Sequence, residues 1–298
     1  MIDKAEVKFD LHMHSTYSDG IFDVKDLIER CKTRRLKLIA ISDHDTTDHI
    51  KPAIEYGKKV GIHVIPAIEL STTHNKKSLH LLGYGIDSQN KKLNNELTRQ
   101  QNARIDRIKK MIAKLHDIGW HIDNSKEIFN KYGSIGRPLL AKIVFENNKN
   151  KDRCKKENIN NFSEFLDKYL TPGAPAWVDR YRTTMELGIE LIHKAGGIAV
   201  WAHPMWSTRK TPEILELTLT QLISFGLDGI EVFYGVHTRE ETKKLYNLAN
   251  KNNLIISAGS DFHSPDRPNF PDVGGWKNYG INWSLDDKLV YCANTKIS

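Results

Sequence analysis

Apolar residues in the first third of the chain follow two alternating patterns. One is the helical spacing of residues 23–35, where Leu27, Ile28 and Cys31 share a face, and a second helix is expected over about 48–60. The other is the short, nearly continuous apolar run that is typical of a buried strand. Such runs occur at 6–12, 36–45, 62–70 and 80–86. Strands that alternate with helices indicate a largely parallel sheet.

The alternation lapses after residue 86 and returns after the segment TPGAPAW, residues 171–177. Helices are then expected over 184–196, about 212–225 and about 238–251, and strands over 197–204, 227–235 and 254–263. Parallel strands joined by right-handed crossovers close readily into a barrel. The pattern therefore predicts one α/β barrel built from both ends of the chain, over 1–88 and 176–298.

The segment between these halves, 89–175, has helical patterns and no strand pattern. A long amphipathic helix is predicted over 93–119, and shorter helices over 137–147 and 162–170. The apolar stripe of the long helix is expected to face a core rather than a partner. It consists of Leu97, Ile105, Ile108, Ile112 and Leu115. We therefore predict a helical subdomain inserted into the barrel.

Composition narrows the class of protein. The 298 residues are 39% hydrophobic and 27% charged, which is typical of a globular chain. No apolar run reaches the roughly 18 residues that cross a membrane, and the charged start, MIDKAEVKFD, lacks the apolar region of a secretory signal. Cys31, Cys154 and Cys292 are too scattered for a zinc pattern or a disulfide framework. We expect a cytoplasmic protein with no membrane partner.

The excess of positive over negative charge lies entirely in the middle segment and the residues just after it. Residues 89–182 hold 20 Lys and Arg against 11 Asp and Glu, a net of +9, whereas the rest holds 24 against 26, a net of −2. A barrel does not need such an excess to fold. An extended anionic substrate would gain from it through steering and phosphate contacts. The alternative is an ordinary solvated helical surface.

Metal-ligand residues recur at the ends of the predicted strands. His12 and His14 are two apart, so in a strand they point to the same face. Similar residues follow other strands, and parallel strands bring their carboxyl ends to one face. The candidates are His12, His14, Asp19, His44, Glu69, His80, His203, Asp261 and His263. Each alone has a structural explanation, but so many at corresponding positions indicate a metal site.

The donor set contains nitrogen and oxygen and no thiolate, which suits Zn²⁺, Mn²⁺ or Fe²⁺. Nine candidates are about the number needed for two or three ions, and a carboxylate such as Glu69 can bridge two of them. Paired ions suit phosphoester hydrolysis, because they activate water and neutralise charge on the attacking and leaving oxygens. The sequence therefore predicts a multi-metal hydrolase.

Five ordered motifs carry a resemblance to a known family: DLHMHSTYSDG, ISDHDTTDHI, AIEL, GIAVWAHP and GSDFHS. They resemble those of the PHP (polymerase and histidinol phosphatase) metal-dependent phosphoesterases. The subgroup most similar is the bacterial nucleoside 3′,5′-bisphosphate phosphatases, also described as 5′-to-3′ exoribonucleases (RNase AM). In the middle segment, IGRPLLAK and YLTPGAPAWV resemble motifs of this subgroup, although Leu139 replaces its usual histidine and Trp177 its tyrosine.

The resemblance implies a distorted (β/α)7 barrel of PHP type, with the helical segment inserted, and three metal ions. One ion would be held by His12, His14, Glu69 and Asp261, a second by Asp19, His44 and His263, and a third by His80 and His203 with Glu69 as the bridge. A metal-bridging hydroxide would then attack phosphorus in line. Glu69, His203 and Asp261 are the residues that we expect to be essential for catalysis.

Three residues are candidates for contacts with substrate. Arg137 lies in the family-like GRP motif, and a guanidinium matches phosphate geometry with two hydrogen bonds. Arg180, in the segment VDRYR, is a second cationic candidate. His237 follows a predicted strand and is expected to face the site, although a helix-start histidine without a function is an alternative.

These observations predict a metal-dependent phosphoesterase. It would release the 3′-phosphate of nucleoside 3′,5′-bisphosphates such as pAp, or degrade short 5′-phosphorylated RNA from the 5′ end. One alternative is a phosphatase for a small metabolite such as histidinol phosphate. Another is a non-catalytic nucleic-acid-binding PHP module. The expected partner is a nucleotide or short oligonucleotide, and no obligate protein partner is inferred.

Overall fold

The computed structural model describes residues 8–123, 136–209 and 211–292. The chain divides into two compact units. The first, here called the barrel unit, comprises Met1–Leu97 and Arg182–Ser298. The second, here called the helical unit, comprises Thr98–Tyr181. None of the helices in the described ranges is long and apolar enough to cross a membrane.

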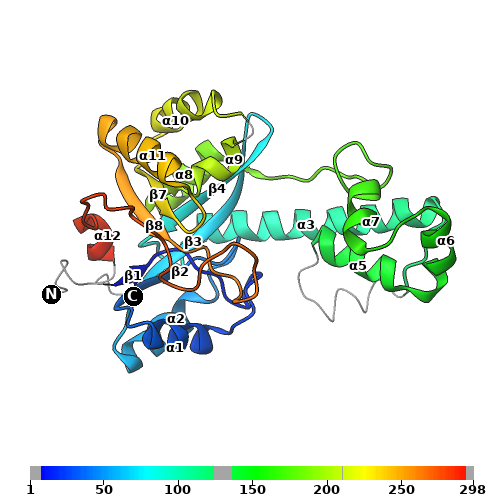
Figure 1. Cartoon of the computed structure of the whole chain (residues 1–298), viewed down its shortest axis with the longest axis horizontal. Helices are drawn as coiled ribbons and strands as arrows, with labels where there is room; N and C mark the ends of the chain where they lie inside the picture. Colours follow the sequence, from blue (N-terminus) through cyan, green and yellow to red (C-terminus); the bar gives the residue numbers. More distant parts are fainter. Residues whose placement is uncertain (1–7, 124–135, 210, 293–298) are drawn as a thin grey trace. The chain divides into compact units, whose positions relative to one another are not determined.

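An eight-stranded sheet forms the centre of the barrel unit (Figure 1). Seven strands follow one another in the order β1-β2-β3-β4-β6-β7-β8, and the short β5 pairs with β3. Their bounds are β1 (Phe9–Asp10), β2 (Leu38–Ile41), β3 (His63–His74), β4 (Lys77–Tyr84), β5 (Thr183–Thr184), β6 (Ile198–Trp201), β7 (Gly229–Tyr234) and β8 (Ile255–Gly259). The backbone of Leu11 then bonds to that of Ala258 at 3.1 Å, which joins the first strand to the last.

The sheet is less parallel than the sequence predicted. β4 runs antiparallel to both β3 and β6, while the other neighbouring strands are parallel. β3 and β4 form one long hairpin in which Asn75 and Lys76 have φ values of 48° and 64°. Positive φ at both central residues is the conformation of a two-residue type I′ turn, whose twist matches that of the strands. The predicted strands 62–70 and 80–86 are therefore parts of this longer hairpin.

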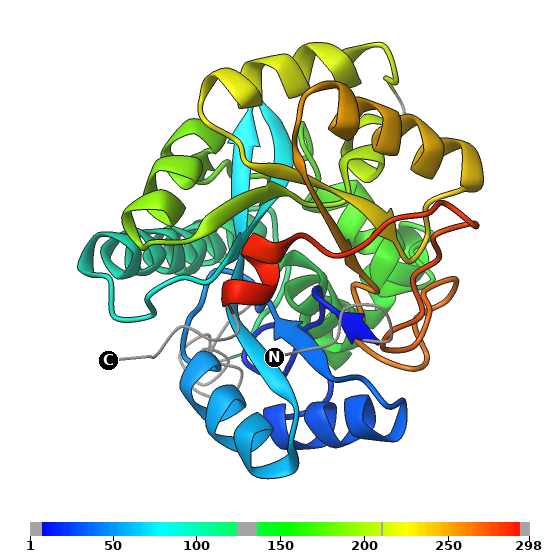
Figure 2. The same cartoon turned by 90° about the vertical axis from the view of Figure 1, so that its left-hand side faces the viewer.

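Helices surround the sheet of the barrel unit (Figure 2). The five expected helices are confirmed, and two shorter ones are added. Their bounds are α1 (Val24–Thr33), α2 (Ile50–Val60), α8 (Met185–Lys194), α9 (Pro204–Thr208), α10 (Ile214–Ser224), α11 (Arg239–Lys251) and α12 (Asp287–Cys292). In α1, Asp23 caps the N-terminus, and Leu27, Ile28 and Cys31 are buried as the spacing predicted.

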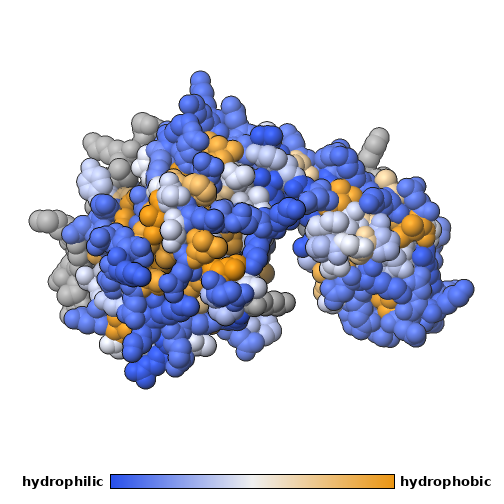
Figure 3. Space-filling model, turned by 90° about the horizontal axis from the view of Figure 1, so that it is seen from above, coloured by the Kyte–Doolittle hydropathy of each residue, from blue (hydrophilic) through white to orange (hydrophobic). Residues whose placement is uncertain are grey.

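The helical unit has its own core. Its elements are α3 (Lys91–Asp117), which begins in the barrel unit, α5 (Arg137–Glu146), the 3-10 turn η1 (Asn148–Asn150), α6 (Lys151–Lys156) and α7 (Phe162–Tyr169). The rings of Trp120, Phe165 and Tyr169 pack within 4.8–5.2 Å of one another at the centre. Hydrophilic residues cover most of the surface of this unit that Figure 3 shows, as expected if its apolar residues face inward.

The boundary between the units falls inside α3 rather than before it. Leu93 and Leu97 belong to the core of the barrel unit. Ile108, Ile112 and Leu115 belong to the core of the helical unit. Four of the five residues of the predicted apolar stripe thus belong to a core, whereas Ile105 is half-buried and belongs to neither. The stripe contributes to two cores in succession, and because the helix is continuous the sequence shows no break at 97–98. The second boundary lies at Tyr181 and Arg182.

Candidate metal centre

His12 and His14 follow β1, and their side chains point into the barrel. Both are completely buried, and their ring centroids are 5.2 Å apart. Met13 between them points the other way, where its sulfur packs against that of Cys31 at 3.7 Å. The alternation that the sequence predicted is therefore present, and it leaves two imidazoles on one side of a strand.

A close approach of backbone keeps this strand in place. A Cβ atom added to Gly259 of β8 would lie 2.2 Å from Cβ of His12. A Cβ atom added to Gly20 would lie 2.2 Å from the carbonyl oxygen of His14. Real Cβ contacts do not occur at this distance, so each position needs glycine for the histidine to stay where it is.

Glu69 on β3 is the centre of the cluster. Its Oε2 lies 3.3 Å from Nε2 of His12, 3.2 Å from Nε2 of His14 and 3.1 Å from Nδ1 of His44. Its Oε1 lies 2.9 Å from Nδ1 of His80 and 3.0 Å from Nε2 of His203. A single buried carboxylate therefore reaches five imidazoles from four segments of the chain. This is the geometry expected of a bridging ligand.

Asp261 lies beside the first pair of histidines. Its Oδ1 is 3.4 Å from Nε2 of His12 and 3.1 Å from Nε2 of His14. Its Oδ2 accepts a hydrogen bond of 2.7 Å from the hydroxyl of Tyr234. Asp261 has a φ of 54° and His203 a φ of 30°. Positive φ values strain the backbone of residues other than glycine, and such residues are concentrated at functional sites.

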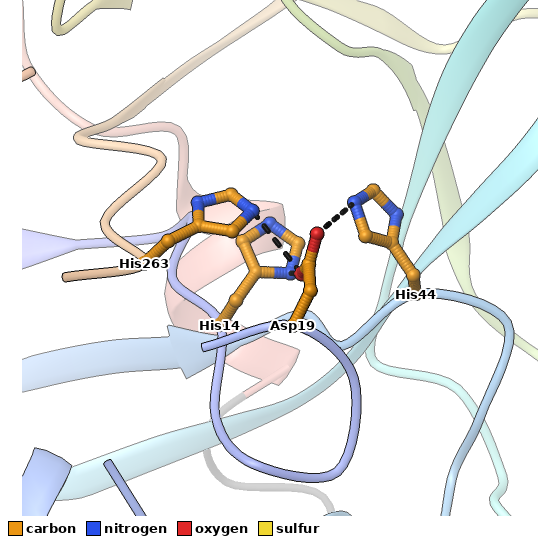
Figure 4. Close-up of side chains that lie close together, drawn as sticks. All are labelled: His14, Asp19, His44 and His263. Carbon is orange, nitrogen blue, oxygen red and sulfur yellow. Dashed lines mark ion pairs between the residues drawn. The ribbon is translucent and has the colours of Figure 1, made fainter. Parts of the chain in front are cut away.

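Asp19 gathers a second group, which Figure 4 shows with His14, His44 and His263. Its Oδ1 is 3.2 Å from Nε2 of His263, and its Oδ2 is 3.9 Å from Nε2 of His44. The side chain of Asp19 is 57% exposed, whereas those of the three histidines are 17% exposed or less. This group therefore lies at the solvent side of the cluster.

Eight of the nine predicted ligands come together in three overlapping groups. The groups overlap because His14, His44 and Glu69 each belong to two of them. Within each group, one ligand atom of each residue lies within 4.8 Å of those of the others. The groups are His14, Asp19, His44 and His263; His12, His14, Glu69 and Asp261; and His44, Glu69 and His80. His203 joins through its contact with Glu69.

Several atoms of the cluster are buried without a hydrogen-bond partner among the described residues. They include Nε2 of His12, Nε2 of His14, Nδ1 of His44 and Oε2 of Glu69. Buried polar atoms are nearly always paired, because an unpaired one costs about 1–3 kcal/mol. Here four such atoms converge on one volume. Divalent cations fit this observation, since imidazole nitrogens and carboxylate oxygens are their ordinary ligands.

The electrostatics agree with a cation site. Burial opposes charge on Glu69 and Asp261, but the surrounding histidines outweigh it and hold both pKa values below their usual range. Burial also acts against a charged His14, yet the carboxylates of Asp261 and Glu69 raise its pKa to about 10. For His44, burial prevails and lowers the pKa to about 4. The carboxylates are thus ionised at neutral pH, and they attract positive charge.

Buried carboxylates outside the ligand set orient it, and the sequence analysis missed them. Glu231 on β7 contacts His12 Nδ1 through Oε1 at 2.9 Å and accepts the backbone N–H of His203 through Oε2 at 2.8 Å. Asp43 accepts the backbone N–H and hydroxyl of Ser15 and the hydroxyl of Ser18, which hold the loop that carries Asp19. For Glu231, the signal in the sequence was a carboxylate inside the otherwise apolar strand GIEVFY.

A third buried carboxylate, that of Asp10, supports the backbone around the site. It accepts hydrogen bonds from the backbone N–H groups of His12, Ser260 and Gly274 and from the hydroxyl of Ser260. Burial raises the pKa of Asp10 to about 6, although these hydrogen bonds act in the opposite direction. Asp10 therefore connects β1 to the segment after β8, where the candidate ligand Asp261 lies.

The three candidate substrate contacts are in different surroundings. Arg137 is the first residue of α5 in the helical unit and is half-buried. Its Nη1 lies 3.3 Å from the carbonyl oxygen of Leu170, and its guanidinium carbon lies 5.2 Å from the ring centre of Trp177. Arg180 is also half-buried in that unit. His237 is only 2% exposed, and Nδ1 bonds to the carbonyl of Val232. Its ring therefore has almost no surface with which to meet a substrate directly.

Leu139, which replaces a histidine of the resembled motif, packs against the core of the helical unit. Arg267 is a further cation near the site that the motifs do not indicate. Nη1 of this residue lies 3.2 Å from the carbonyl oxygen of Asp261 and 3.4 Å from its Oδ2. It is the cation closest in the chain to the ligand motif GSDFHS, and its position four residues after His263 was the signal in the sequence.

Comparisons with known proteins agree with this site. The family model described as PHP domain matches residues 10–172. A 5′-3′ exoribonuclease of Haemophilus influenzae is 30% identical over 95% of this chain and 97% of its own. A 3′,5′-nucleoside bisphosphate phosphatase of Chromobacterium violaceum is 30% identical over 86% of this chain and 87% of its own.

Solved structures show the same fold. A Chromobacterium violaceum protein described as an amidohydrolase, solved with bound sulfate and no metal, superposes with a TM-score of 0.71 at 28% identity, covering 91% of this chain and 92% of that one. A putative metal-dependent phosphoesterase of Bifidobacterium adolescentis gives a TM-score of 0.75 at 23% identity, with 99% of each chain covered. The predicted distorted barrel is confirmed.

Proposed function

Since the chain belongs to the PHP domain family and is a metal-dependent phosphoesterase, we propose that it hydrolyses the 3′-phosphate of nucleoside 3′,5′-bisphosphates and degrades short 5′-phosphorylated RNA from its 5′ end. The observation that carries this proposal is the convergence of unpaired buried donor atoms around Glu69. The two relatives at 30% identity support the substrate class, because one is named for each of these activities.

We propose that the cluster binds two or three divalent ions, chosen from Mn²⁺, Zn²⁺ and Fe²⁺. One set of ligands would be His12, His14, Glu69 and Asp261, and a second would be Asp19, His44 and His263. A third would be His80 and His203, which face the other oxygen of Glu69. A donor set of imidazole and carboxylate suits these ions. When bound, the ions would supply a water activated at neutral pH and would neutralise charge on the phosphate.

The residues of the chain have separable tasks in this proposal. Glu69 holds the histidine groups at a fixed separation, because its two oxygens face different members. Asp261 is oriented by the hydroxyl of Tyr234, and His203 is fixed by the hydrogen bond from its backbone to Glu231. These contacts set the positions of Glu69, His203 and Asp261, the proposed catalytic residues, before substrate arrives.

The basic charge of the helical unit supports a polyanionic substrate. We propose that Arg137 and Arg180 contact phosphates that are not cleaved, and that the partner is a nucleotide or short oligonucleotide rather than a membrane or an obligate protein.

For the buried His237, a supporting position beside Tyr234, with ring centroids 4.9 Å apart, fits better than a direct contact with substrate. The buried free thiols of the three cysteines are consistent with the proposed cytoplasmic location.

A direct assay tests this function. The protein is freed of metal with a chelator, resupplied with Mn²⁺, Zn²⁺ or Fe²⁺, and given pAp, short 5′-phosphorylated RNA and histidinol phosphate side by side. We expect metal-dependent phosphate release from pAp and shortening of the RNA from its 5′ end. Turnover of histidinol phosphate alone would favour a metabolite phosphatase. Binding of RNA without turnover of any substrate would favour a non-catalytic module.

A further inference from the structure

An exposed tryptophan lies beside the metal centre. Trp206, in α9, follows the ligand His203 by three residues and is 54% exposed. A single exposed aromatic side chain is common on protein surfaces, so the meaning of Trp206 depends on the residues that lie next to it. The core does not explain the placement of Trp206, because the buried residues of α9 are Pro204, Met205 and Thr208.

A second aromatic ring connects Trp206 with the ligands. The ring centroid of Phe270 is 6.1 Å from that of Trp206, with an angle of 60° between the planes. Phe270 also meets the edge of Tyr234 at 6.3 Å. Tyr234 donates a hydrogen bond to the ligand Asp261. The aromatic residues therefore form a continuous series from the exposed surface to the metal centre.

A cation lies at the inner end of this series. The guanidinium carbon of Arg267 is 3.5 Å from the ring centre of Phe270, which orients the planar group on the aromatic face. Its Nη1 lies within 3.4 Å of Asp261 and 2.6 Å from Nδ1 of His263. The side chain of Arg267 is 30% exposed. It is thus held at the ligands while part of it still faces solvent.

We propose that Trp206, Phe270 and Arg267 form a nucleotide subsite, in which the two aromatic rings bind the base and the guanidinium binds the phosphate at the metal centre. Bases stack on aromatic side chains whatever their identity, and guanidinium groups fit phosphate oxygens. The inference rests on the proposed function and adds to it which residues recognise the base. It predicts that recognition is through a π-face and is tolerant of base identity.

The aromatic part is tested with a nucleoside 3′,5′-bisphosphate and its abasic analogue, the same sugar bisphosphate without a base. For Trp206→Ala we expect kcat/KM to fall roughly 5- to 150-fold on the nucleotide, mainly through KM, and to stay unchanged on the abasic analogue. Trp206→Phe should retain most of the affinity. Tyr291→Ala is the matched control, because this aromatic residue of α12 is 70% exposed and has no place in the subsite.

Binding of the product provides a readout that does not depend on turnover. Titration with a nucleoside 5′-monophosphate should quench tryptophan fluorescence in the wild-type protein, and Trp206→Phe should remove that quenching while binding persists. If Trp206→Ala lowers kcat/KM equally on the nucleotide and on the abasic analogue, the assignment is overturned. A wild-type protein that cleaves neither compound would instead refute the proposed function, so the two failures are distinguishable.

The cationic part needs a different pair of variants. Arg267→Ala should lower kcat/KM roughly 10- to 150-fold on both compounds, because the phosphate is common to them. Metal content per chain should remain unchanged. Arg30→Ala is the matched control: its side chain is 29% exposed and lies over Phe262 at 5.3 Å, but it pairs with Asp272. Loss of metal from Arg267→Ala, or an effect no larger than that of Arg30→Ala, would contradict a phosphate contact.

Discussion

Nδ1 of His12 and Oε1 of Glu231 lie 2.9 Å apart, and both side chains are completely buried. The carboxylate is placed to accept a proton from Nδ1 of His12, and with a metal bound this would leave the free pair on Nε2 facing Glu69 and Asp261. Since Glu231 also accepts the backbone N–H of His203, it orients ligands from two strands. It acts on the metal centre without reaching it.

The first prediction concerns Glu231→Gln. The amide keeps the size of the side chain but loses the charge that fixes the tautomer of His12. We expect metal affinity to fall about 10- to 100-fold, as is usual for partners that orient a ligand. Calorimetric titration of metal-free protein with Mn²⁺ measures this. The control is Glu190→Gln, which removes an exposed ion pair with Lys194 in α8. Equal affinities of the two variants would contradict a positioning role.

The second prediction concerns Glu69→Gln. An amide cannot supply the negative charge that several histidine groups share, so the ions would lose their common ligand. We expect kcat/KM to fall more than roughly 100-fold, together with a lower metal content per chain. Circular dichroism should show the wild-type fold. A folded variant with near-normal phosphate release would show that Glu69 does not bridge.

Much of the fold and the site was predictable because it depends on local periodicity. The two-residue alternation around Met13 places both neighbouring histidines on one face, and this needs no knowledge of the rest of the chain. The gathering of His203 and Asp261 with them follows from the rule that parallel strands end at one side of the sheet. The structure places these residues together, and their role as metal ligands stays a prediction.

The remainder depended on contacts distant in sequence. Glu231 contacts His12 across 219 positions, and a single acid in an apolar strand does not reveal its partner. The hairpin of β3 and β4 was read as two strands because the turn at Asn75 and Lys76 lacks the glycine that usually marks it. The boundary inside α3 could not be predicted from the sequence, because one helix supplies apolar residues to two cores and its helical spacing of apolar residues does not change.

The third prediction concerns the stability of the helical unit at low pH. Glu157 accepts hydrogen bonds from Tyr169, from Nε of Arg153 at 2.7 Å and from Nζ of Lys168 at 2.9 Å. Burial acts to raise its pKa, but these donors outweigh it and lower the pKa to about 2. The charged form is thus favoured in the folded state. Its stabilising effect is complete above about pH 4.5 and is lost as the pH falls towards 2.

Thermal unfolding of the wild-type protein and of Glu157→Gln checks this. We expect the variant to melt a few degrees lower at pH 7, and the difference in Tm should shrink as the pH falls below about 4.5. Glu146→Gln is the control in the same unit, because its pair with Lys142 is 3.9 Å long and exposed, and such pairs contribute little. A difference in Tm that is constant from pH 7 to pH 2 would contradict the assignment.

The fourth prediction concerns Arg137 and the phosphate that is not cleaved. A guanidinium that holds the 5′-phosphate would position the substrate while the metal centre acts on the 3′-phosphate. Such positioning strengthens in the transition state, so its loss lowers kcat/KM. For Arg137→Ala we expect a fall of roughly 10- to 150-fold with pAp, the value of a charge-assisted hydrogen bond. With p-nitrophenyl phosphate, which has no second phosphate, the fall should be much smaller.

The comparison of the two substrates separates the possible origins of such an effect. Lys142→Ala, an exposed cation of the same helix α5, is the control for a general loss of positive charge. Equal losses of Arg137→Ala on both substrates would place Arg137 at the cleaved group or in the fold, where its contacts with Leu170 and Trp177 already give it a structural task. No loss on either would mean that the GRP motif does not act on substrate in this chain. In that case Leu139, which packs against the core of the helical unit where the resembled motif has histidine, would mark a change of substrate.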